Sequence, residues 1–527
     1  MQIIIPMSGI GERFLKYGIS TPKPLIKVDG KPIIHHVIDM FPEETNFTFI
    51  CNNDHLSNKK FNMEKIIRSK IPEAKIIGIK AHKLGPIFAI SQILDQIKDD
   101  EPLIINYCDF TCYWDYKLFK KIILDNEYDG SIPAYRNFHP HSLWGNNYAF
   151  IKEDNFLLKD IQEKLPFTDN KMKEFASSGT YYFKSGKLLK ESISYCFKNN
   201  LTVNDEFYVS TAYNYLIKNK MKVYVHEIEH FMQWGTPEDL NEYISWSEIF
   251  KNYKKLQKNN KDSNHAIIMP MAGFGQRFIE EGYHKPKPLL NVKGVPMFKA
   301  VLDDLPIAGI YVFVLRKNMK NLDIILKNIN LFYPKSIIKI LDKETDGQAI
   351  SCLEGLKALE EHNPTYDGPI TFASCDTGFI YNEKKFSDWI KSGKSDVLAW
   401  SATNHPTAVR FPNFFGWINT DQKNIKSVSV KKPLKNPKID NLIVGTFTFK
   451  RKDIFKKSIE SLIKRKEMVN GEFYLDSSIN DAIQLGYNCE IFKVDNMISW
   501  GTPNDLETFK YWEKCFKKWK SHEFSGF

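Results

Sequence analysis

Residues 3–32 read IIIPMSGIGERFLKYGISTPKPLIKVDGKP, and residues 267–296 read IIMPMAGFGQRFIEEGYHKPKPLLNVKGVP. Aligned without gaps, 16 of these 30 positions are identical, against about two expected from ordinary residue usage. Such self-similarity at a fixed distance indicates an internal duplication. The sequence therefore predicts two copies of one domain, with this stretch repeated 264 positions later.

Each copy of the stretch has the features of an anion-binding loop. In the first copy an apolar run precedes Gly9 and Gly11, and Arg13 and Lys23 then add two cations. The apolar run predicts a buried parallel strand, and the glycines allow backbone N–H groups to turn toward an anion. The pattern is not a P-loop, which needs Gly-Lys-Ser/Thr, nor a dinucleotide fingerprint, which needs a third glycine where Phe14 stands. We therefore expect a polyphosphate site, and the second copy has the same residue types at Gly273, Gly275, Arg277 and Lys287.

Length and composition favour two globular domains. A chain of 527 residues is too long for one ordinary core, so we predict a first domain at 1–255, a linker at 256–264 and a second domain at 265–527. Hydrophobic residues make up 43% of the sequence, and no apolar run approaches the roughly 18 residues that span a bilayer. With no signal peptide and eight scattered cysteines, we expect a cytoplasmic protein with free thiols.

The net charge of +10 could suggest a nucleic-acid partner. The lysines are dispersed, however, and no basic cluster or RNA-binding signature is found. We expect neither nucleic acid nor membrane as a partner. The positive potential would instead assist entry of anionic substrates into a cleft. The oligomeric state is left open.

The order of apolar runs predicts the fold class. Strands at about 2–6, 47–51, 75–79 and 103–107 alternate with helical patterns at about 60–70 and 86–98, which is typical of a parallel doubly wound α/β sheet. Ligands of such sheets bind beyond the carboxyl ends of the strands. Further strands are expected near 130–135, 147–151 and 178–184, with counterparts near 396–401, 414–418 and 443–449.

The tail from Lys510 to Lys520 is basic and aromatic. A membrane-surface helix is one interpretation, with Trp512, Phe516 and Trp519 on one face. Aromatic residues occupy the same positions 266 residues earlier. We therefore predict that this helix is part of each domain and that its stripe packs on its own core.

Gly-x-Gly-x-Arg-Phe followed by Pro-Lys-Pro-Leu resembles the signature of the sugar-phosphate nucleotidyltransferases. Glu206-Phe207-Tyr208 and the Trp-Gly-Thr-Pro-Glu-Asp-Leu run at 234–240 are similar to the branch found among bacterial capsule and surface-polysaccharide enzymes. The resemblance extends through both halves. It implies two tandem Rossmann-like (GT-A-like) domains, each a mostly parallel sheet with flanking helices. It also implies transfer of a nucleotide from an NTP to a phosphorylated metabolite, with release of pyrophosphate.

The resemblance implies a role for each motif residue. The backbone at Gly9 and Gly11 would hold the triphosphate, Arg13 its β and γ phosphates, and Lys23 the α-phosphate. The base would be read near Gly85 and Gly347, although turn geometry also explains these glycines. The later strands of each half, at about 130–184 and 396–449, would form its acceptor-binding part. Acceptor-binding residues would be Lys164, Gly179, Glu206, Lys431, Lys432, Gly445 and Glu472. For the lysines an exposed strand position is the alternative, and for the glutamates a helix start.

Asp109 and Asp376 end apolar strands, where a carboxylate is costly unless it is paired or bound to metal. In the family this position binds Mg²⁺, and the alternative is a helix N-cap. Related enzymes often carry a second metal-binding aspartate two residues before the late Gly-Thr, but Gln233 and Ser499 stand there. Mg²⁺ would then be held by one carboxylate together with water or phosphate oxygens.

Three alternatives concern function. A glycosyltransferase has a similar fold but usually needs an Asp-x-Asp metal motif, which is absent at Asp109 and Asp376. One half could be a regulatory or structural copy. Finally, the halves could use different acceptors, because Trp144 is replaced by Arg410 and Asp205 by Gly471, although loop drift explains such changes equally well.

Overall fold

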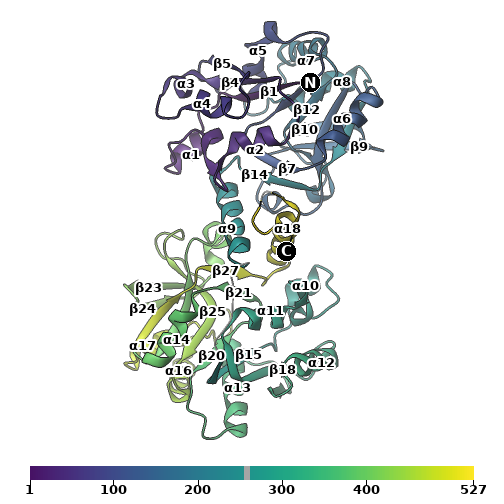
Figure 1. Ribbon diagram of the computed structural model, residues 1–527. Coiled ribbons are helices and arrows are strands. Elements are labelled where there is room, and N and C mark those ends of the chain that lie inside the picture. The colour runs from purple at the N-terminus through teal and green to yellow at the C-terminus, as the bar shows by residue number, and fades with distance from the viewer. Residues whose placement is uncertain (254–260, 521, 527) are drawn as a thin grey trace. The chain divides into compact units, whose positions relative to one another are not determined.

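The computed structural model describes residues 1–253, 261–520 and 522–526, and the chain divides into two compact units (Figure 1). The first unit comprises Met1–Ser247 and Lys514–Phe527, and the second comprises Glu248–Glu513. Of the predicted linker at 256–264, residues up to 260 lie outside the described part, and the remainder belongs to the strand β15 (Lys261–Pro270).

A ten-stranded sheet forms the first unit, in the order β5-β4-β1-β6-β12-β8-β13-β10-β9-β11. The four strands at one side, β5, β4, β1 and β6, are mutually parallel, as predicted. Ile3, Ile4 and Ile5 of β1 are completely buried, as both faces of a parallel sheet require. The strands are β1 (Gln2–Met7), β4 (Phe47–Asn52), β5 (Lys75–Ile79), β6 (Leu103–Asn106), β8 (Gly130–Tyr135), β9 (Ala149–Asp154), β10 (Leu157–Glu163), β11 (Phe175–Ser177), β12 (Thr180–Phe183) and β13 (Val223–Glu227).

The prediction that each sheet is mostly parallel is wrong, because the acceptor-side strands are largely antiparallel. Of these strands, β12 runs antiparallel to both β6 and β8, and β10 runs antiparallel to β9 and β13. Antiparallel strands can be joined by a two-residue turn without a crossover helix, and β9 and β10 are joined in this way. Asn155 and Phe156, with φ of 51° and 61°, form the two-residue turn between β9 and β10. The fold is therefore a mixed α/β fold.

The second unit repeats this arrangement in a nine-stranded sheet, β19-β18-β15-β20-β25-β22-β26-β24-β23. The long strand β25 takes the place of both β11 and β12, since it pairs with β20, β22 and β23. Each strand thus has a counterpart in the first unit at the same place in the order. The bounds are β18 (Ile307–Arg316), β19 (Ile337–Leu341), β20 (Ile370–Ala373), β22 (Val397–Ala402), β23 (Trp417–Asp421), β24 (Asn424–Ser429), β25 (Asn441–Phe449) and β26 (Cys489–Lys493).

Short two-stranded ladders lie outside the main sheets. In the first unit one ladder joins β7, which follows Asp109, to β14, which precedes the late Gly-Thr-Pro motif. The pair β21 and β27 does the same in the second unit. The bounds are β2 (Lys27–Val28), β3 (Lys31–Pro32), β7 (Phe110–Tyr113), β14 (His230–Gln233), β16 (Asn291–Val292), β17 (Val295–Pro296), β21 (Thr377–Ile380) and β27 (Asn496–Ser499).

Helices cover the sheets with apolar faces. In the first unit α5, α7 and α8 share one core with Ile4 and Ile105, and in the second unit α13, α16 and α17 share one with Ile268 and Phe372. Figure 1 shows α13 along β15 and β18. The helices of the first half of the chain are α1 (Glu12–Lys16), α2 (Ile33–Asp39), α3 (Asn53–Ser57), α4 (Met63–Arg68), α5 (Pro86–Ser91), α6 (Tyr116–Asp125), α7 (Gly186–Lys198), α8 (Val209–Lys218), α9 (Pro237–Tyr253), η1 (Lys23–Leu25), η2 (Leu94–Gln96), η3 (Pro140–Leu143) and η4 (Lys171–Lys173). Those that follow are α10 (Gln276–Glu280), α11 (Met297–Asp304), α12 (Leu322–Phe332), α13 (Gln348–His362), α14 (Glu383–Ser392), α15 (Pro406–Arg410), α16 (Lys452–Lys464), α17 (Ser478–Gln484), α18 (Pro503–Lys518), η5 (Lys287–Leu289) and η6 (Pro412–Phe414).

The tail departs in part from the prediction that its aromatic stripe packs on its own half: Trp512 belongs to the second unit, whereas Phe516 of α18 and Trp519 just after it belong to the first. Trp519 stacks on Trp234 with ring centroids 6.4 Å apart, and Phe516 contacts Tyr243 at 5.6 Å. All four residues belong to the first unit. The last part of α9 belongs to the second unit in the same way. A helix of 16 residues is about 24 Å long, so its two ends can serve different cores.

Across the described residues, none of the helices combines the length and apolarity needed to cross a membrane.

Candidate active site

The glycine-rich loop lies at the carboxyl end of β1, as predicted. Gly11 has a φ of 76° and precedes α1, and its counterpart Gly275 has a φ of 65° and precedes α10. This left-handed conformation favours glycine. A Cβ built on Gly9 or Gly273 would meet no atom within 4 Å. The loop therefore faces open space in both units, where a ligand could approach the backbone.

A cavity of about 440 Å³ lies beside this loop in the first unit. That volume is within the range of small-molecule sites, roughly 300–1,000 Å³. Every site residue predicted for the first half lines it: Gly9, Gly11, Arg13, Lys23, Gly85, Asp109, Lys164, Gly179 and Glu206. The structure thus brings together residues separated by almost 200 positions, while their individual roles remain predictions.

Lys23 and Asp109 form an ion pair in the wall of the cavity. The Lys23 Nζ lies 2.8 Å from the Asp109 Oδ2, and the side chains are 24% and 22% exposed. Burial lowers the pKa of Lys23, but the Asp109 carboxylate more than offsets it, so the pKa is raised. Lys23 is therefore a fixed cation at neutral pH. The exposed Arg13 is near enough to act against that shift.

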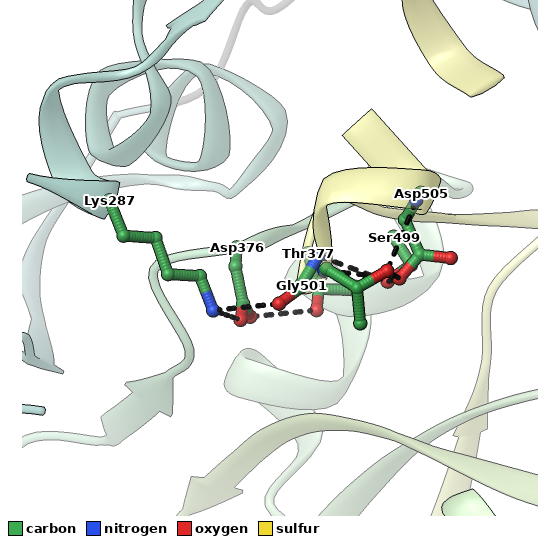
Figure 2. A network of polar contacts seen from close by, with 7 residues as sticks. Lys287, Asp376, Thr377, Ser499, Gly501 and Asp505 are labelled. Atoms are coloured by element: carbon green, nitrogen blue, oxygen red, sulfur yellow. Dashed lines mark hydrogen bonds and ion pairs between the residues drawn. The ribbon is translucent and has the colours of Figure 1, made fainter. Parts of the chain in front are cut away.

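The second unit has the same pair, Lys287 and Asp376 (Figure 2). Lys287 also donates to the Gly501 carbonyl at 3.2 Å. Burial raises the pKa of Asp376, but Lys287 outweighs burial, and the pKa is lowered. Figure 2 shows Ser499 and Asp505 beside the pair, and the Ser499 hydroxyl donates to Asp505 at 3.2 Å. The central charges of the two sites therefore match.

Both aspartates lie in the loop after the fourth parallel strand, and neither is a helix N-cap. Each is the residue immediately before a strand of the small ladder, whose partner places Gln233 opposite Phe110 and Ser499 opposite Thr377. A Cβ on Gly235 would lie 2.8 Å from the Asp109 Oδ2 and 3.0 Å from the Gln233 Nε2. Gln233, which stands where related enzymes often carry a second aspartate, therefore lies next to Asp109.

In the part of the chain that the structure describes, no three His, Cys, Asp or Glu side chains gather to hold a metal. Mg²⁺ usually keeps several waters and binds through one or two carboxylates together with substrate phosphates. Asp109 with the Gln233 amide, and Asp376 with the Ser499 hydroxyl, fit that mode of binding. They do not form an all-protein cage.

Gly85 and Gly347 begin α5 and α13, as predicted, with φ of 85° and 117°. A Cβ on either glycine would lie 2.6–2.7 Å from backbone atoms of Phe207 or Phe473, in the middle of the Glu-Phe-Tyr motifs. Phe207 N–H donates to the Leu84 carbonyl at 2.9 Å. Close backbone approach therefore explains both glycines, whether or not a base is read beside them.

The acceptor lysines are equivalent residues in the two units. Lys164 and Lys431 have positive φ, 62° and 53°. The Nζ atom of Lys164 lies 4.4 Å from the ring centroid of Tyr208, and that of Lys431 lies 5.0 Å from that of Tyr474. Lys432 is exposed, and its carbonyl accepts a hydrogen bond from Ser429 at 2.6 Å. Of the two predicted lysines, Lys431 is therefore the counterpart of Lys164.

Glu206 and Glu472 end two-residue turns that precede α8 and α17, rather than beginning a helix. Asp205 and Gly471 are the second central residues of these turns, with φ of 62° and 80°. Both central positions of such a turn need positive φ, so local geometry explains a glycine there. The other proposed difference between the halves is Trp144 against Arg410, and Trp144 is not among the residues that line the first-unit cavity.

Gly179 and Gly445 lie beside the fourth parallel strand. Gly179 has a φ of 94°, and its carbonyl accepts from Tyr107 N–H at 3.0 Å. The Gly445 carbonyl accepts from Ser374 N–H at 3.2 Å. Each glycine holds the acceptor-side strand against the segment that leads to the aspartate.

Comparison with known proteins adds a distant relative. No family model matches the sequence. Over 283 residues the chain is 26% identical to the bifunctional protein GlmU of Methanocaldococcus jannaschii, an alignment that spans 54% of this chain and 61% of that protein. The chain therefore spans about three fifths of the length of this curated relative.

Solved structures resemble about half of the chain. The nucleoside-diphosphate-sugar pyrophosphorylase from Vibrio cholerae is 22% identical with a TM-score of 0.39, over 46% of this chain and 98% of its own. The inositol-1-phosphate CTP transferase from T. maritima is 16% identical with a TM-score of 0.36, over 49% of this chain and 97% of its own. A UDP-glucose pyrophosphorylase complexed with UDP-glucose is 19% identical with a TM-score of 0.37, over 48% of this chain and 99% of its own.

A contact from outside the glycine-loop motif braces the first glycine loop. His82 lies 3.1 Å from the Ser8 hydroxyl, and both residues line the cavity. The second unit has Ala272 in place of Ser8, and the Arg316 Nε donates to the Ala272 carbonyl at 3.1 Å. The Arg316 guanidinium also lies 3.8 Å from the ring centroid of Phe274. The loops are thus held by different residues, which a comparison of the two motifs alone could not show.

Glu163 was also missed, although it directly precedes Lys164 in the wall of the cavity. Its Oε2 accepts from the Ser210 hydroxyl at 2.6 Å. Burial raises the pKa of Glu163 to about 7, with Glu206 adding to the shift and Ser210 and Lys164 opposing it. The carboxyl group is therefore partly protonated at neutral pH.

We predict that Glu163→Gln stabilises the protein more at pH 8 than at pH 5. The folded pKa is raised, so the folded state gains protons relative to the unfolded state between pH 4.5 and about 7, and stability falls as pH rises through that window. The variant removes this loss, which is at most about 3 kcal/mol. Melting temperatures of parent and variant across this range provide the measurement. An equal difference between them at both pH values would contradict the shift.

Proposed function

We propose that each half of the chain catalyses Mg²⁺-dependent transfer of a nucleotide from an NTP to a phosphorylated sugar or other small phosphorylated metabolite, with release of pyrophosphate. The chain is an enzyme of the nucleotidyltransferase type. The observation that carries the proposal is the partly buried lysine–aspartate pair beside an open glycine loop, present in both units. The sequence motifs support the same class of reaction.

The reaction is an in-line attack of an acceptor phosphate oxygen on the α-phosphorus, with pyrophosphate leaving on the opposite side. The site must hold the triphosphate and the acceptor phosphate together and compensate the negative charge that develops on the leaving pyrophosphate. The reaction needs no nucleophilic side chain. Lys23 and Lys287 are the fixed cations for the α-phosphate. Arg13 and Arg277 reach the outer phosphates, and the glycine-loop N–H groups contact them. Because Asp109 holds Lys23 in position before substrate enters, little reorganisation is needed during the reaction.

Mg²⁺, when bound with the triphosphate, would supply Lewis-acid stabilisation of the phosphate oxygens. Asp109 and Asp376 would hold it, with Gln233 and Ser499 beside them. The Lys23–Asp109 and Lys287–Asp376 pairs then have a second purpose, which is to keep each carboxylate directed into the site.

The acceptor phosphate is assigned to Lys164 and Lys431, since each presents an ammonium group at the end of an acceptor-side strand. The tyrosine ring under each ammonium limits its freedom. We propose further that the products are activated precursors for a surface polysaccharide, as the branch resemblance implies, and that they are made in the cytoplasm, where the eight free cysteines would remain reduced.

The deciding experiment measures pyrophosphate release by the full chain with each NTP and a panel of phosphorylated sugars and polyols. We expect release only when Mg²⁺, an NTP and an acceptor are all present, and loss of release when EDTA removes the metal. Formation of a nucleoside diphosphate without pyrophosphate, using a nucleotide sugar, would instead establish a glycosyltransferase. Release from a chain whose second site is inactivated would show that the first half is active, and the reciprocal test applies to the second.

A further inference from the structure

The two units place one carboxyl group beside the acceptor lysine, but on different segments. Lys164 and Lys431 are equivalent by their conformation and their tyrosine partners. The residue before Lys164 is Glu163, whereas the residue before Lys431 is Val430. The second unit therefore lacks the strand-end carboxyl group of the first.

A carboxyl group appears instead on the segment that faces the strand. Ser210 stands two residues after Tyr208, and Asp476 stands two residues after Tyr474. In the first unit the Ser210 hydroxyl donates to Glu163, which shows that this position and the strand end are in contact. The pair Glu163 and Ser210 thus becomes Val430 and Asp476, and the carboxyl group has moved from one side of the contact to the other.

The neighbouring strand accommodates the moved group. Ile151 pairs with Ile161 in the first unit, and Ile418 pairs with Val428 in the second. This register makes Ala149 of the cavity wall equivalent to Gly416. A Cβ built on Gly416 would lie 2.7 Å from the Asp476 Oδ2, so the missing methyl group makes room for the carboxyl group.

Asp476 is poised to bind a ligand. Among the described residues, no side chain donates a hydrogen bond to the Asp476 carboxyl group. Burial raises the pKa of Asp476 to about 6, against the influence of Lys431. Its own backbone N–H donates to this half-buried carboxyl group, and a carboxylate offers about four acceptor sites, so acceptor sites remain for a ligand. Hydroxyl groups of a polyhydroxy acceptor would donate to these sites.

We propose that Asp476 is an acceptor-binding residue of the second half and that it takes the place held by Glu163 in the first half. The two halves then present a carboxyl group to the hydroxyl groups of a phosphorylated polyhydroxy acceptor from different segments, with the acceptor phosphate at Lys164 or Lys431. This proposal rests on the proposed function. It makes the exchange of Glu163 and Ser210 for Val430 and Asp476 a determinant of acceptor specificity.

The test uses the full chain carrying Lys23→Ala, so that only the second half turns over, with the acceptor that supports pyrophosphate release. We expect Asp476→Asn to raise the acceptor KM about 10- to 100-fold, as loss of a charge-assisted hydrogen bond does, while the NTP KM is unchanged. Deoxy analogues of the acceptor should include one that parent and variant bind alike, because it lacks the hydroxyl bound by Asp476. Asp388→Asn, at an exposed position of α14, is the matched control.

A second variant moves the carboxyl group instead of removing it. Val430→Glu combined with Asp476→Ser recreates the first-half arrangement, and acceptor preference should shift toward that of the first half. Normal release with an unchanged acceptor KM in Asp476→Asn would overturn the inference and leave the proposed function intact. Absence of release from the Lys23→Ala parent with every acceptor would contradict both for the second half.

Discussion

Lys23→Ala is expected to lower turnover by the first half about 10²-fold or more, and Lys287→Ala to do the same in the second, because each removes a preorganised cation from the transition state. Lys23 lies 2.8 Å from Asp109 and is 24% exposed, so water that enters the site after the substitution cannot provide the same stabilisation of negative charge. The double variant should release almost no pyrophosphate, whereas each single variant should lose only the activity of its own half.

The fold is expected to survive these changes. Lys23 and Lys287 line the sites and lie outside both large apolar cores. Thermal unfolding of each variant tests this, and Lys23→Arg tests whether charge alone suffices, since a guanidinium differs in shape and donor geometry. The exposed pair of Lys117 and Glu43, 2.6 Å apart, is the matched control: Lys117→Ala should leave turnover unchanged. Parental activity in the double variant would refute the assigned role.

Much of the site could be predicted because its residues lie at positions that the fold class determines. Lys23 and Asp109 are 86 positions apart. Each follows a parallel strand, and the carboxyl ends of such strands meet at one edge of the sheet. Duplication strengthened the prediction, since Lys287 and Asp376 repeat the types and the order. The glycines at 85 and 347 were found for a related reason, because positive φ leaves few alternatives.

What could not be predicted depends on side chains that exchange places or cross between repeats. Glu163 aligns with a valine, so comparison of the copies suggests loss of a carboxyl group, and only the contact with Ser210 shows where it has gone. The direction of the acceptor-side strands was missed because short polar alternation does not distinguish hairpins from crossovers. The tail was misassigned because an apolar helix face does not specify which core will cover it.

The second large effect concerns Asp109→Asn and Asp376→Asn, each of which should lower its own half's turnover on the order of 10²-fold or more. The substitution removes the one carboxylate that fits Mg²⁺, so the Mg²⁺ concentration for half-maximal rate should rise. It also removes the charge that offsets burial of the paired lysine, so burial then lowers the pKa of that lysine. The residual rate should therefore fall as pH rises, whereas the parental rate should not.

Run against one acceptor panel, the same two variants show whether the halves differ in substrate. We expect different preferences, because the sites diverge where an acceptor would lie: Glu163 and Ser210 become Val430 and Asp476, while the lysines keep the same conformation. The change from Asp205 to Gly471 contributes nothing to this expectation, since turn geometry explains it. Identical preferences in both variants would mean redundant halves. If one variant loses all pyrophosphate release and the other loses none, only the half that carries the inactivating substitution is catalytic. The other half is then a structural or regulatory copy.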